Sequence, residues 1–283
     1  MQEYICLNGD YYKAEEPVLL YNNRGFQYGD ALFETMRGNG KTLYFFDEHI
    51  SRIYHSMKEL GMEVPKNIEN KTIKKEILKL LHKNRHLKGS RIRLTVFRNV
   101  GGKYAPVTNT VSYLIETDAL EDENYQLNEK GIAIDIFHAY KKPRNLLSNM
   151  KTTNDLVYVL AGIFKNDQKL DECILLNDNN EIIEAISSNI FLVKDNIIKT
   201  PPLNSGCLNG IMRKQILNFA KIAGFKISLQ QMYPEDLMNC EEIFLTNSVR
   251  GIQWVGAFRE TRYFKNTSRQ MMNILNQLAK PED

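Results

Sequence analysis

The chain has 283 residues, of which 43% are hydrophobic and 25% charged, a composition typical of a globular protein long enough for two domains. Its net charge of +3, from 37 basic and 34 acidic residues, argues against a nucleic-acid or membrane-surface role. Four scattered cysteines without a C-x-x-C pair, a polar N-terminus and no membrane-length apolar run lead us to expect a soluble, cytoplasmic protein without metal or disulfides.

Short strands and two helices are expected in the first part of the chain. The turn Asn8-Gly9-Asp10 predicts a hairpin between strands at residues 4–8 and 11–13. A helix should start at a cap, Asp47, and end at Gly61. The other elements predicted here are strands at 31–37, 42–45, 91–96 and 111–115 and a helix over 67–86.

A polar stretch at residues 118–130 is the expected domain boundary, so we predict domains at 1–120 and 121–283. Strands and helices then follow one another in the second domain. The predicted strands lie at 132–137, 172–176, 182–184, 190–193 and 243–245, and helices are expected after residue 151, from Gly210 to Gly224, and from about residue 268.

Lys151 stands before a segment with apolar residues at helical spacing, which predicts one face long enough to be buried. Thr152 with Asp155 three residues later has the pattern of a capping box, so the helix should begin just after the lysine. A helix N-terminus disfavours an ammonium and favours the free amine that attacks carbonyls. Most lysines are nevertheless solvated charges, and this one needs companions.

Three further features accompany Lys151. Glu184 ends a strand before the loop Ser187-Ser188-Asn189, and Gly206 to Gly210 opens a helix whose backbone N–H groups suit an anion. The third, Thr246-Asn247-Ser248, offers hydroxyl and amide donors after a strand. Each has an ordinary alternative, namely a surface acid, a glycine cap or a plain turn. Their order and spacing are what indicate a site.

In this order the motifs resemble the fold-type IV pyridoxal-phosphate enzymes, which are branched-chain and D-amino-acid aminotransferases and 4-amino-4-deoxychorismate lyase. The resemblance covers nearly the whole chain. It is carried by Arg24-Gly25-Phe26-Gln27-Tyr28-Gly29-Asp30, His49-x-x-Arg52, Lys151, Glu184-x-x-x-x-Asn189-Ile190-Phe191, Asn209-Gly210-Ile211-Met212-Arg213 and Thr246-Asn247-Ser248.

This resemblance implies an α/β (α+β) fold with a smaller N-terminal α/β domain, a larger β-barrel-like C-terminal domain with helices, and a cofactor in the cleft. It also implies a homodimer, in which residues 26–33 of the partner reach over the site. No nucleic acid or membrane is an expected partner.

The resemblance also assigns roles. Lys151 matches the lysine that forms a Schiff base with pyridoxal 5′-phosphate, and Glu184 matches the acid that keeps the pyridine nitrogen protonated. Arg52 matches a phosphate-binding arginine, although a salt bridge to Asp47 or Glu48 on its own helix is the alternative. The implied cofactor-binding set is completed by Asn189, Gly210, Ile211, Met212, Thr246 and Asn247, with Met212 standing where the family usually has threonine.

A substrate site is expected near a strand on which Arg91 and Arg93 alternate with buried residues, so that one face is cationic. These arginines bind a substrate carboxylate or form an exposed cationic face, and the residues do not decide between the two. The predicted substrate-binding set is Phe33, Arg91, Arg93 and Arg98.

Three functions are weighed for this small-molecule amino substrate. The first is 4-amino-4-deoxychorismate lyase in folate biosynthesis, because residues 98–104 and 245–252 resemble that branch and the cations suit a dicarboxylate. The second is an amino-acid aminotransferase using a 2-oxo acid, which Phe33-Glu34 resembles more. The third is a scaffold without chemistry, which has no need for lysine, acid and phosphate cradle together.

Overall fold

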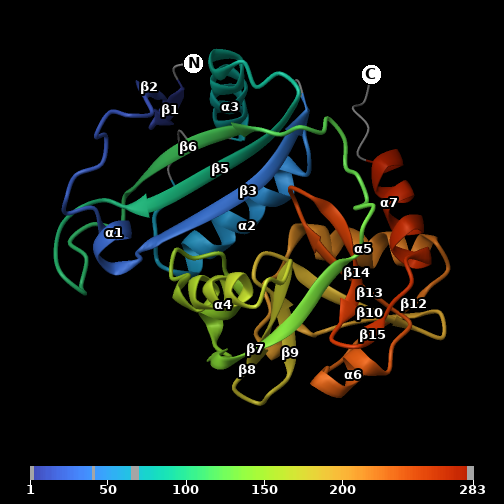
Figure 1. Cartoon of the computed structure of the whole chain (residues 1–283). Coiled ribbons are helices and arrows are strands. Elements are labelled where there is room, and N and C mark those ends of the chain that lie inside the picture. Colours follow the sequence, from blue (N-terminus) through green and yellow to red (C-terminus); the bar gives the residue numbers. More distant parts are fainter. Residues whose placement is uncertain (1–2, 40–41, 65–69, 279–283) are drawn as a thin grey trace. The chain divides into compact units, whose positions relative to one another are not determined.

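A computed structural model describes residues 3–39, 42–64 and 70–278 (Figure 1). The chain divides into two compact units. The N-terminal unit comprises Met1–Asn124 and Lys151–Asn154, and the C-terminal unit comprises Tyr125–Met150 and Asp155–Asp283. The short segment 151–154 therefore belongs to the first unit, although it lies far along the chain.

The N-terminal unit is built on an antiparallel sheet with the strand order β2-β1-β6-β5-β3-β4. The predicted hairpin is confirmed, with Asn8 and Gly9 both at positive φ in its turn. Its strands are β1 (Tyr4–Leu7), β2 (Asp10–Lys13), β3 (Ala31–Asn39), β4 (Thr42–Leu43), β5 (Gly89–Arg98) and β6 (Val111–Ala119).

Three helices accompany this sheet: α1 (Arg24–Tyr28), α2 (Phe46–Glu59) and α3 (Asn70–Asn84). The α2 helix packs on β3, and α3 packs on β1 and β6. The prediction that Asp47 caps α2 is wrong, because the helix starts at Phe46 and no side chain caps it; Asp47 instead lies in the first turn. The predicted start of the next helix at residue 67 lies outside the described residues.

The C-terminal unit has a mixed sheet with the strand order β12-β11-β10-β13-β14-β7-β8-β9, and β15 pairs with β14. The sheet curls into a partial barrel, because β9 at one end of this order also contacts β10. Its strands are β7 (Ile132–Lys142), β8 (Glu172–Asn177), β9 (Ile182–Ala185), β10 (Asn189–Lys194), β11 (Ile197–Thr200), β12 (Lys226–Leu229), β13 (Glu242–Asn247), β14 (Gly251–Phe258) and β15 (Thr261–Arg262).

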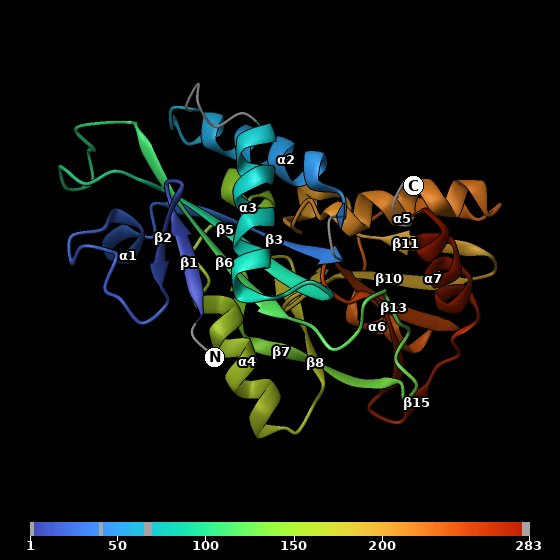
Figure 2. The same ribbon diagram turned by 90° about the horizontal axis from the view of Figure 1, so that it is seen from above.

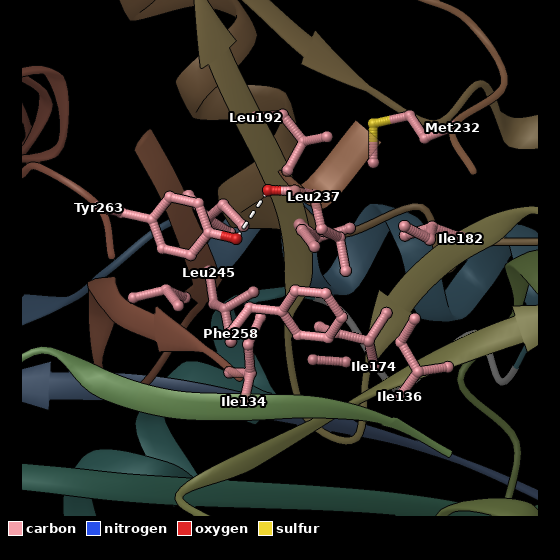
Figure 3. Packing of buried hydrophobic residues seen from close by; sticks show 14 of the residues in the cluster. Ile134, Ile136, Ile174, Ile182, Leu192, Met232, Leu237, Leu245, Phe258 and Tyr263 are labelled. Atoms are coloured by element: carbon pink, nitrogen blue, oxygen red, sulfur yellow. Dashed lines mark hydrogen bonds between the residues drawn. The ribbon is translucent and has the colours of Figure 1, made fainter. Parts of the chain in front are cut away.

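The core of this unit follows the two-residue period of its strands. Figure 3 shows alternate residues such as Ile134, Ile136 and Ile174 packed with Phe258 in one apolar cluster, where the Tyr263 hydroxyl donates to the Leu237 carbonyl at 2.7 Å. The residues between them, including Phe137 and Leu175, form a second cluster on the other face of the sheet. The strand β8 is thus buried on both of its faces.

The helices of this unit are α4 (Leu156–Asp167), α5 (Ile211–Ile222), α6 (Pro234–Met238) and α7 (Asn266–Leu278). The α4 helix packs on β7 and β8, and α7 lies beside α5, as Figure 2 shows. Two 3-10 helices, Leu146–Asn149 and Leu203–Ser205, complete the elements. Within the described ranges, no helix is long and apolar enough to cross a membrane.

The prediction for α4 is wrong in two respects. The helix starts at Leu156, and Asp155 before it makes no side-chain cap, so the expected capping box is absent. The expected buried face is also exposed in the chain, because Leu156 is 77% and Ile163 53% accessible. Among residues of the helix itself only Ala161 is fully buried.

Candidate functional site

Lys151 is held by the edge of β3 rather than by a helix terminus. The Phe33 N–H donates to the Lys151 carbonyl at 2.9 Å, and the Thr153 N–H donates to the Ala31 carbonyl at 3.1 Å. A β-bridge between Leu32 and Thr152 completes this pairing. The expectation that a helix N-terminus acts on the Lys151 amine is therefore wrong, since α4 begins five residues later.

The side chain of Lys151 lies over an aromatic ring. Its Nζ is 4.2 Å from the centre of the Phe33 ring, and the Arg93 Cζ is 3.8 Å from the same centre. Phe33 itself is buried. An amine and a guanidinium thus share one ring, which positions both of them by cation–π contacts.

A buried charged cluster lies next along β3. The Glu34 carboxylate accepts from Arg52 Nε at 2.7 Å and from Arg52 Nη2 at 2.5 Å, which is a bidentate pair. His49 Nδ1 lies 2.6 Å from the same carboxylate. The predicted alternative for Arg52 was a salt bridge to Asp47 or Glu48 on its own helix. Glu34, on a strand, is a partner that the sequence did not predict.

Electrostatics define the protonation states in this cluster. Burial alone would raise the pKa of Glu34, but the Arg52 guanidinium and the His49 ring outweigh it and hold the pKa below its usual range. Burial lowers the pKa of His49, which makes the neutral ring the stable form. Its Nδ1–H must then donate to Glu34, and its buried Nε2 makes no hydrogen bond among the described residues.

Glu184 is buried in the C-terminal unit and accepts three hydrogen bonds. Its Oε1 accepts from Lys142 Nζ at 2.6 Å and from the Tyr158 hydroxyl at 2.7 Å. Its Oε2 accepts from the Leu208 N–H at 2.7 Å. Burial, and after it the charge of Glu184, raises the pKa of Tyr158 well above its usual value, so the phenol stays neutral and remains a donor.

A β-bulge turns Glu184 toward these donors. Ile182 of β9 pairs with Leu176 of β8, and Glu184 pairs with the adjacent Leu175. Ile183 is therefore an extra residue in β9 without a partner in β8. Leu175 belongs to the apolar cluster on the α4 face of the sheet, whereas Ile182 faces the barrel core. Strict alternation would have put Glu184 on the same side as Ile182, where its carboxylate would face the apolar cluster of the barrel core.

The α5 helix begins at Ile211, directly after Gly210 as predicted, and no side chain caps it. Its first N–H groups belong to Ile211, Met212 and Arg213, and such a terminus suits an anion. Gly210 is needed for close approach, because an added Cβ would lie 1.9 Å from Asn189 Oδ1. That amide cannot move easily, since it is buried and its Nδ2 donates to the Leu208 carbonyl at 2.9 Å.

The neighbouring strand adds a hydroxyl. Thr246 pairs with Asn189 across β13 and β10, and its buried Oγ1 has no hydrogen-bond partner in the described part of the chain. A buried hydroxyl of this kind calls for a ligand. The Asn247 side chain, in contrast, is engaged: Nδ2 donates to Ser188 Oγ at 3.0 Å, and Oδ1 accepts from the N–H groups of Val249 and Arg250.

The predicted cations are distributed unevenly. Arg93 lies beside Phe33, and its Nε is 3.9 Å from Glu116 Oε2; Arg91 forms an ion pair with Asp118. Arg98 is buried, and its three nitrogen atoms donate to Asp30, Leu60, Gly61 and Asn109. These hydrogen bonds stabilise the N-terminal unit and occupy all three nitrogen atoms of Arg98, so a substrate role is proposed for Arg93 and not for Arg98.

Sequence reasoning missed two members of the Glu184 cluster. Lys142 follows an exposed lysine, Lys141, and no local signal distinguishes the two. Tyr158 stands in an apolar helical segment, where an aromatic residue suggests only packing. Sequence reasoning also considered Glu34 only in the comparison of the two enzyme branches, and not as the partner of Arg52. The alternation of Arg91 and Arg93 with buried residues, on the other hand, is confirmed.

Known proteins resemble this chain along most of its length. The profile of the family described as amino-transferase class IV matches residues 31–258. The aminodeoxychorismate lyase of Bacillus subtilis (strain 168) is 29% identical over 285 residues, covering 98% of this chain and 94% of that protein. The D-alanine aminotransferase of Bacillus licheniformis is 25% identical over 292 residues, covering 98% and 99%.

A solved structure has the same fold. The T.th. branched-chain amino acid aminotransferase complexed with N-(5′-phosphopyridoxyl)-L-glutamate superposes with a TM-score of 0.85, covering 96% of this chain and 92% of that one. At 20% identity this likeness concerns the fold alone. The mixed α/β architecture with its curled sheet, as expected from the sequence, is thereby confirmed.

Proposed function

The chain belongs to the amino-transferase class IV family, and from this premise we propose that it is a 4-amino-4-deoxychorismate lyase, forming 4-aminobenzoate and pyruvate. It is an enzyme, and its cofactor is pyridoxal 5′-phosphate. When bound, this cofactor supplies an aldehyde for amines and a ring that takes up negative charge from the substrate carbon.

The residues of the C-terminal unit fit the phosphate of this cofactor. The uncapped start of α5 offers backbone N–H groups, and the Thr246 hydroxyl is buried without a partner beside it. Met212 brings no hydroxyl, so under this proposal Thr246 contributes the one that the family usually obtains from threonine at position 212. Asn189 acts on the phosphate indirectly, by keeping Gly210 in place.

The roles of Lys151, Glu184 and Arg52 are also part of the proposal. Lys151 would hold the cofactor and move the proton, Glu184 would face the pyridine nitrogen, and Arg52 would bind phosphate through the donors that its pair with Glu34 orients. Because Glu34 cancels the charge of Arg52, this arginine would contribute directed hydrogen bonds more than net positive charge.

The observation that carries the proposal is the pair of cations on the Phe33 ring. Arg93 would bind a substrate carboxylate at its guanidinium, while the Lys151 amine removes the proton from the ring carbon that bears the amino group. The enolpyruvyl ether then breaks, the side chain leaves as pyruvate after taking up a proton, and the ring becomes aromatic. The B. subtilis lyase matches almost end to end, which supports this branch.

An aminotransferase is the second candidate, and one observation favours it. Arg98 is engaged by the protein, Arg91 is paired with Asp118, and Arg93 Nε lies 3.9 Å from Glu116, so the positive charge offered to a dicarboxylate is smaller than expected. One guanidinium suits an amino acid with a single carboxylate equally well. The D-alanine aminotransferase relative matches over the same length.

Product analysis separates the two. We expect the purified chain with pyridoxal 5′-phosphate to release 4-aminobenzoate and pyruvate from 4-amino-4-deoxychorismate without any 2-oxo acid. Parallel incubations contain L- and D-amino acids with 2-oxoglutarate, and liquid chromatography follows all products. Rapid amino transfer without any 4-aminobenzoate would show that the aminotransferase assignment is right and the lyase assignment wrong.

A homodimer is part of the proposal, because the exposed face of α4 suits a second copy. Leu156, Val159, Leu160 and Ile163 recur at helical spacing on this face, and all four side chains are exposed. A two-fold dimer would bring the same face of both copies together. Phe26 in the segment expected to reach the partner is 83% exposed, whereas Phe33 at its end is buried.

Sedimentation velocity tests the α4 face. We expect a dimer for the unchanged chain and a monomer for Ile163→Glu, since a carboxylate in the apolar contact would be desolvated. The matched control is Ile222→Glu on α5, where a side chain that is 76% exposed lies outside the α4 face. A dimer that survives Ile163→Glu would place the interface elsewhere.

A further inference from the structure

The Glu184 cluster contains a buried ammonium that the proposed reaction does not use. The Lys142 side chain is 9% exposed and that of Glu184 4%, so both charges are removed from water together. Besides Glu184, the Lys142 ammonium donates to the Ser148 carbonyl at 2.8 Å and lies 5.6 Å from the centre of the Tyr158 ring. A lysine with such partners is a built feature of the unit, not a chance surface contact.

The cluster joins four segments at one carboxylate. Glu184 lies on β9, Lys142 ends β7, and Tyr158 comes from α4. Leu208, which supplies the backbone donor, stands two residues before Gly210, in the segment that leads into α5. The orientation of the carboxylate is thus determined from two sides, by the side-chain donors on Oε1 and by the backbone on Oε2.

Other titratable groups near Glu184 do not replace the lysine. Burial raises the pKa of the Cys207 thiol to about 11, so it stays neutral. Tyr158 is a neutral donor, and Asp155 acts on Tyr158 with a negative charge. Among the groups described around this carboxylate, Lys142 is the cation in direct contact, and a buried carboxylate without a cation favours its protonated, neutral form.

We propose that Lys142 is a positioning residue, which keeps Glu184 ionised and aimed by direct contact between its ammonium and Oε1. Through the proposed role of Glu184, it would maintain the negative charge that faces the pyridine nitrogen. Tyr158 shares this task as a neutral donor. The inference rests on the proposed function only for that last consequence, because the contact itself involves this chain alone.

The first test uses the full chain without cofactor and measures Tm by calorimetry between pH 5 and pH 8. In Lys142→Met, the folded chain should retain a proton on Glu184 that the unfolded chain releases, so its stability falls as the pH rises. The Tm difference from the unchanged chain should widen by on the order of 5 °C over this interval. A difference that stays constant with pH would show that Lys142 only fills space.

Three further variants make the result specific. Lys142→Arg keeps a cation and should show no widening, and neither should Lys141→Met, which removes the adjacent exposed lysine bound to Asn180. In Lys142→Met/Glu184→Gln the titrating group is gone, so the widening should disappear. Should Lys142→Met not fold, Tyr158→Phe removes only one donor and should give a smaller widening in the same direction; a constant difference there would overturn the proposal.

The second test adds pyridoxal 5′-phosphate and follows its visible absorbance from pH 6 to 9. For Lys142→Met the pH at which the band changes should shift relative to Lys141→Met, and the affinity at pH 8 should fall by about tenfold or more. Identical titration curves would contradict the link to Glu184. If even the unchanged chain binds no cofactor, the proposed function fails, while the Tm experiment still decides the role of Lys142.

Discussion

The Lys151→Ala chain is expected to fold like the unchanged chain and to lose turnover by more than about 10⁴-fold, because under the proposed function the removed amine holds the cofactor and moves the proton. The fold should survive because the main chain of this segment pairs with β3 through backbone groups, which alanine keeps. Circular dichroism checks the fold, and mass spectrometry after borohydride reduction checks the covalent cofactor.

The matched control for this experiment is Lys165→Ala, which removes a lysine from α4 and should leave activity and covalent cofactor intact. Cofactor that remains attached to the Lys151→Ala chain would show that another lysine carries it. Peptide mapping would then examine Lys142 first, since it is a buried lysine in contact with Glu184.

Arg52→Ala should have the largest effect on stability. It leaves the Glu34 carboxylate buried without its bidentate guanidinium, and breaking a buried pair from one side costs about 3–5 kcal/mol of unfolding free energy. Cofactor affinity should fall as well, by about 1.5–3 kcal/mol, for the loss of the proposed charge-assisted hydrogen bond to phosphate. Urea denaturation measures the first quantity and equilibrium titration with pyridoxal 5′-phosphate the second.

A double variant separates the two effects. In Glu34→Gln/Arg52→Met both charges are absent, so much of the stability should return while the cofactor affinity stays low. Affinity equal to that of the unchanged chain would mean that Arg52 serves only as the partner of Glu34.

The same pair predicts how the unchanged chain responds to acid. The folded pKa of Glu34 lies below the unfolded value of 4.5, so its contribution to stability is present above pH 4.5 and lost as the pH falls below it. Urea denaturation from pH 6 to pH 3 should show this loss in the unchanged chain and not in the double variant. The His49 ring should add a separate loss of stability in the unchanged chain as the pH falls below 6.5, because the unfolded ring takes up a proton there while burial lowers the pKa of the folded ring.

Several parts of the fold and of the site could be predicted because their signals are local. Asn8-Gly9 adopts the positive φ angles of a tight hairpin, and Gly210 stands at a helix start where a larger residue would meet Asn189. Alternation along β5 likewise assigned Ile92, Leu94 and Val96 to the buried face. In each case a few neighbouring residues determine the local backbone conformation, so the sequence alone is sufficient to predict the element.

Local signals failed where a competing long-range contact determined the outcome. Thr152 and Asp155 have the spacing of a capping box, yet residues 151–153 pair with β3, which is more than a hundred residues earlier in the chain. This pairing satisfies backbone groups of Lys151 and Thr153, and α4 can then begin only after the segment has left the strand. The apolar residues of α4 do lie on one face, as their spacing predicted. Their spacing does not specify, however, whether this face packs against the same chain or against another one.

The sequence by itself determined which residues are available for chemistry, since Arg52, Lys151 and Glu184 stand out through the motifs in which they occur. Only the tertiary structure decided their partners. A single bulged residue in β9 turns Glu184 toward the α4 face, and Lys142 rather than the identical Lys141 beside it meets that carboxylate. Neighbouring residues of a strand point to opposite sides, so the partner of each charge depends on strand pairing and register, which no local signal encodes.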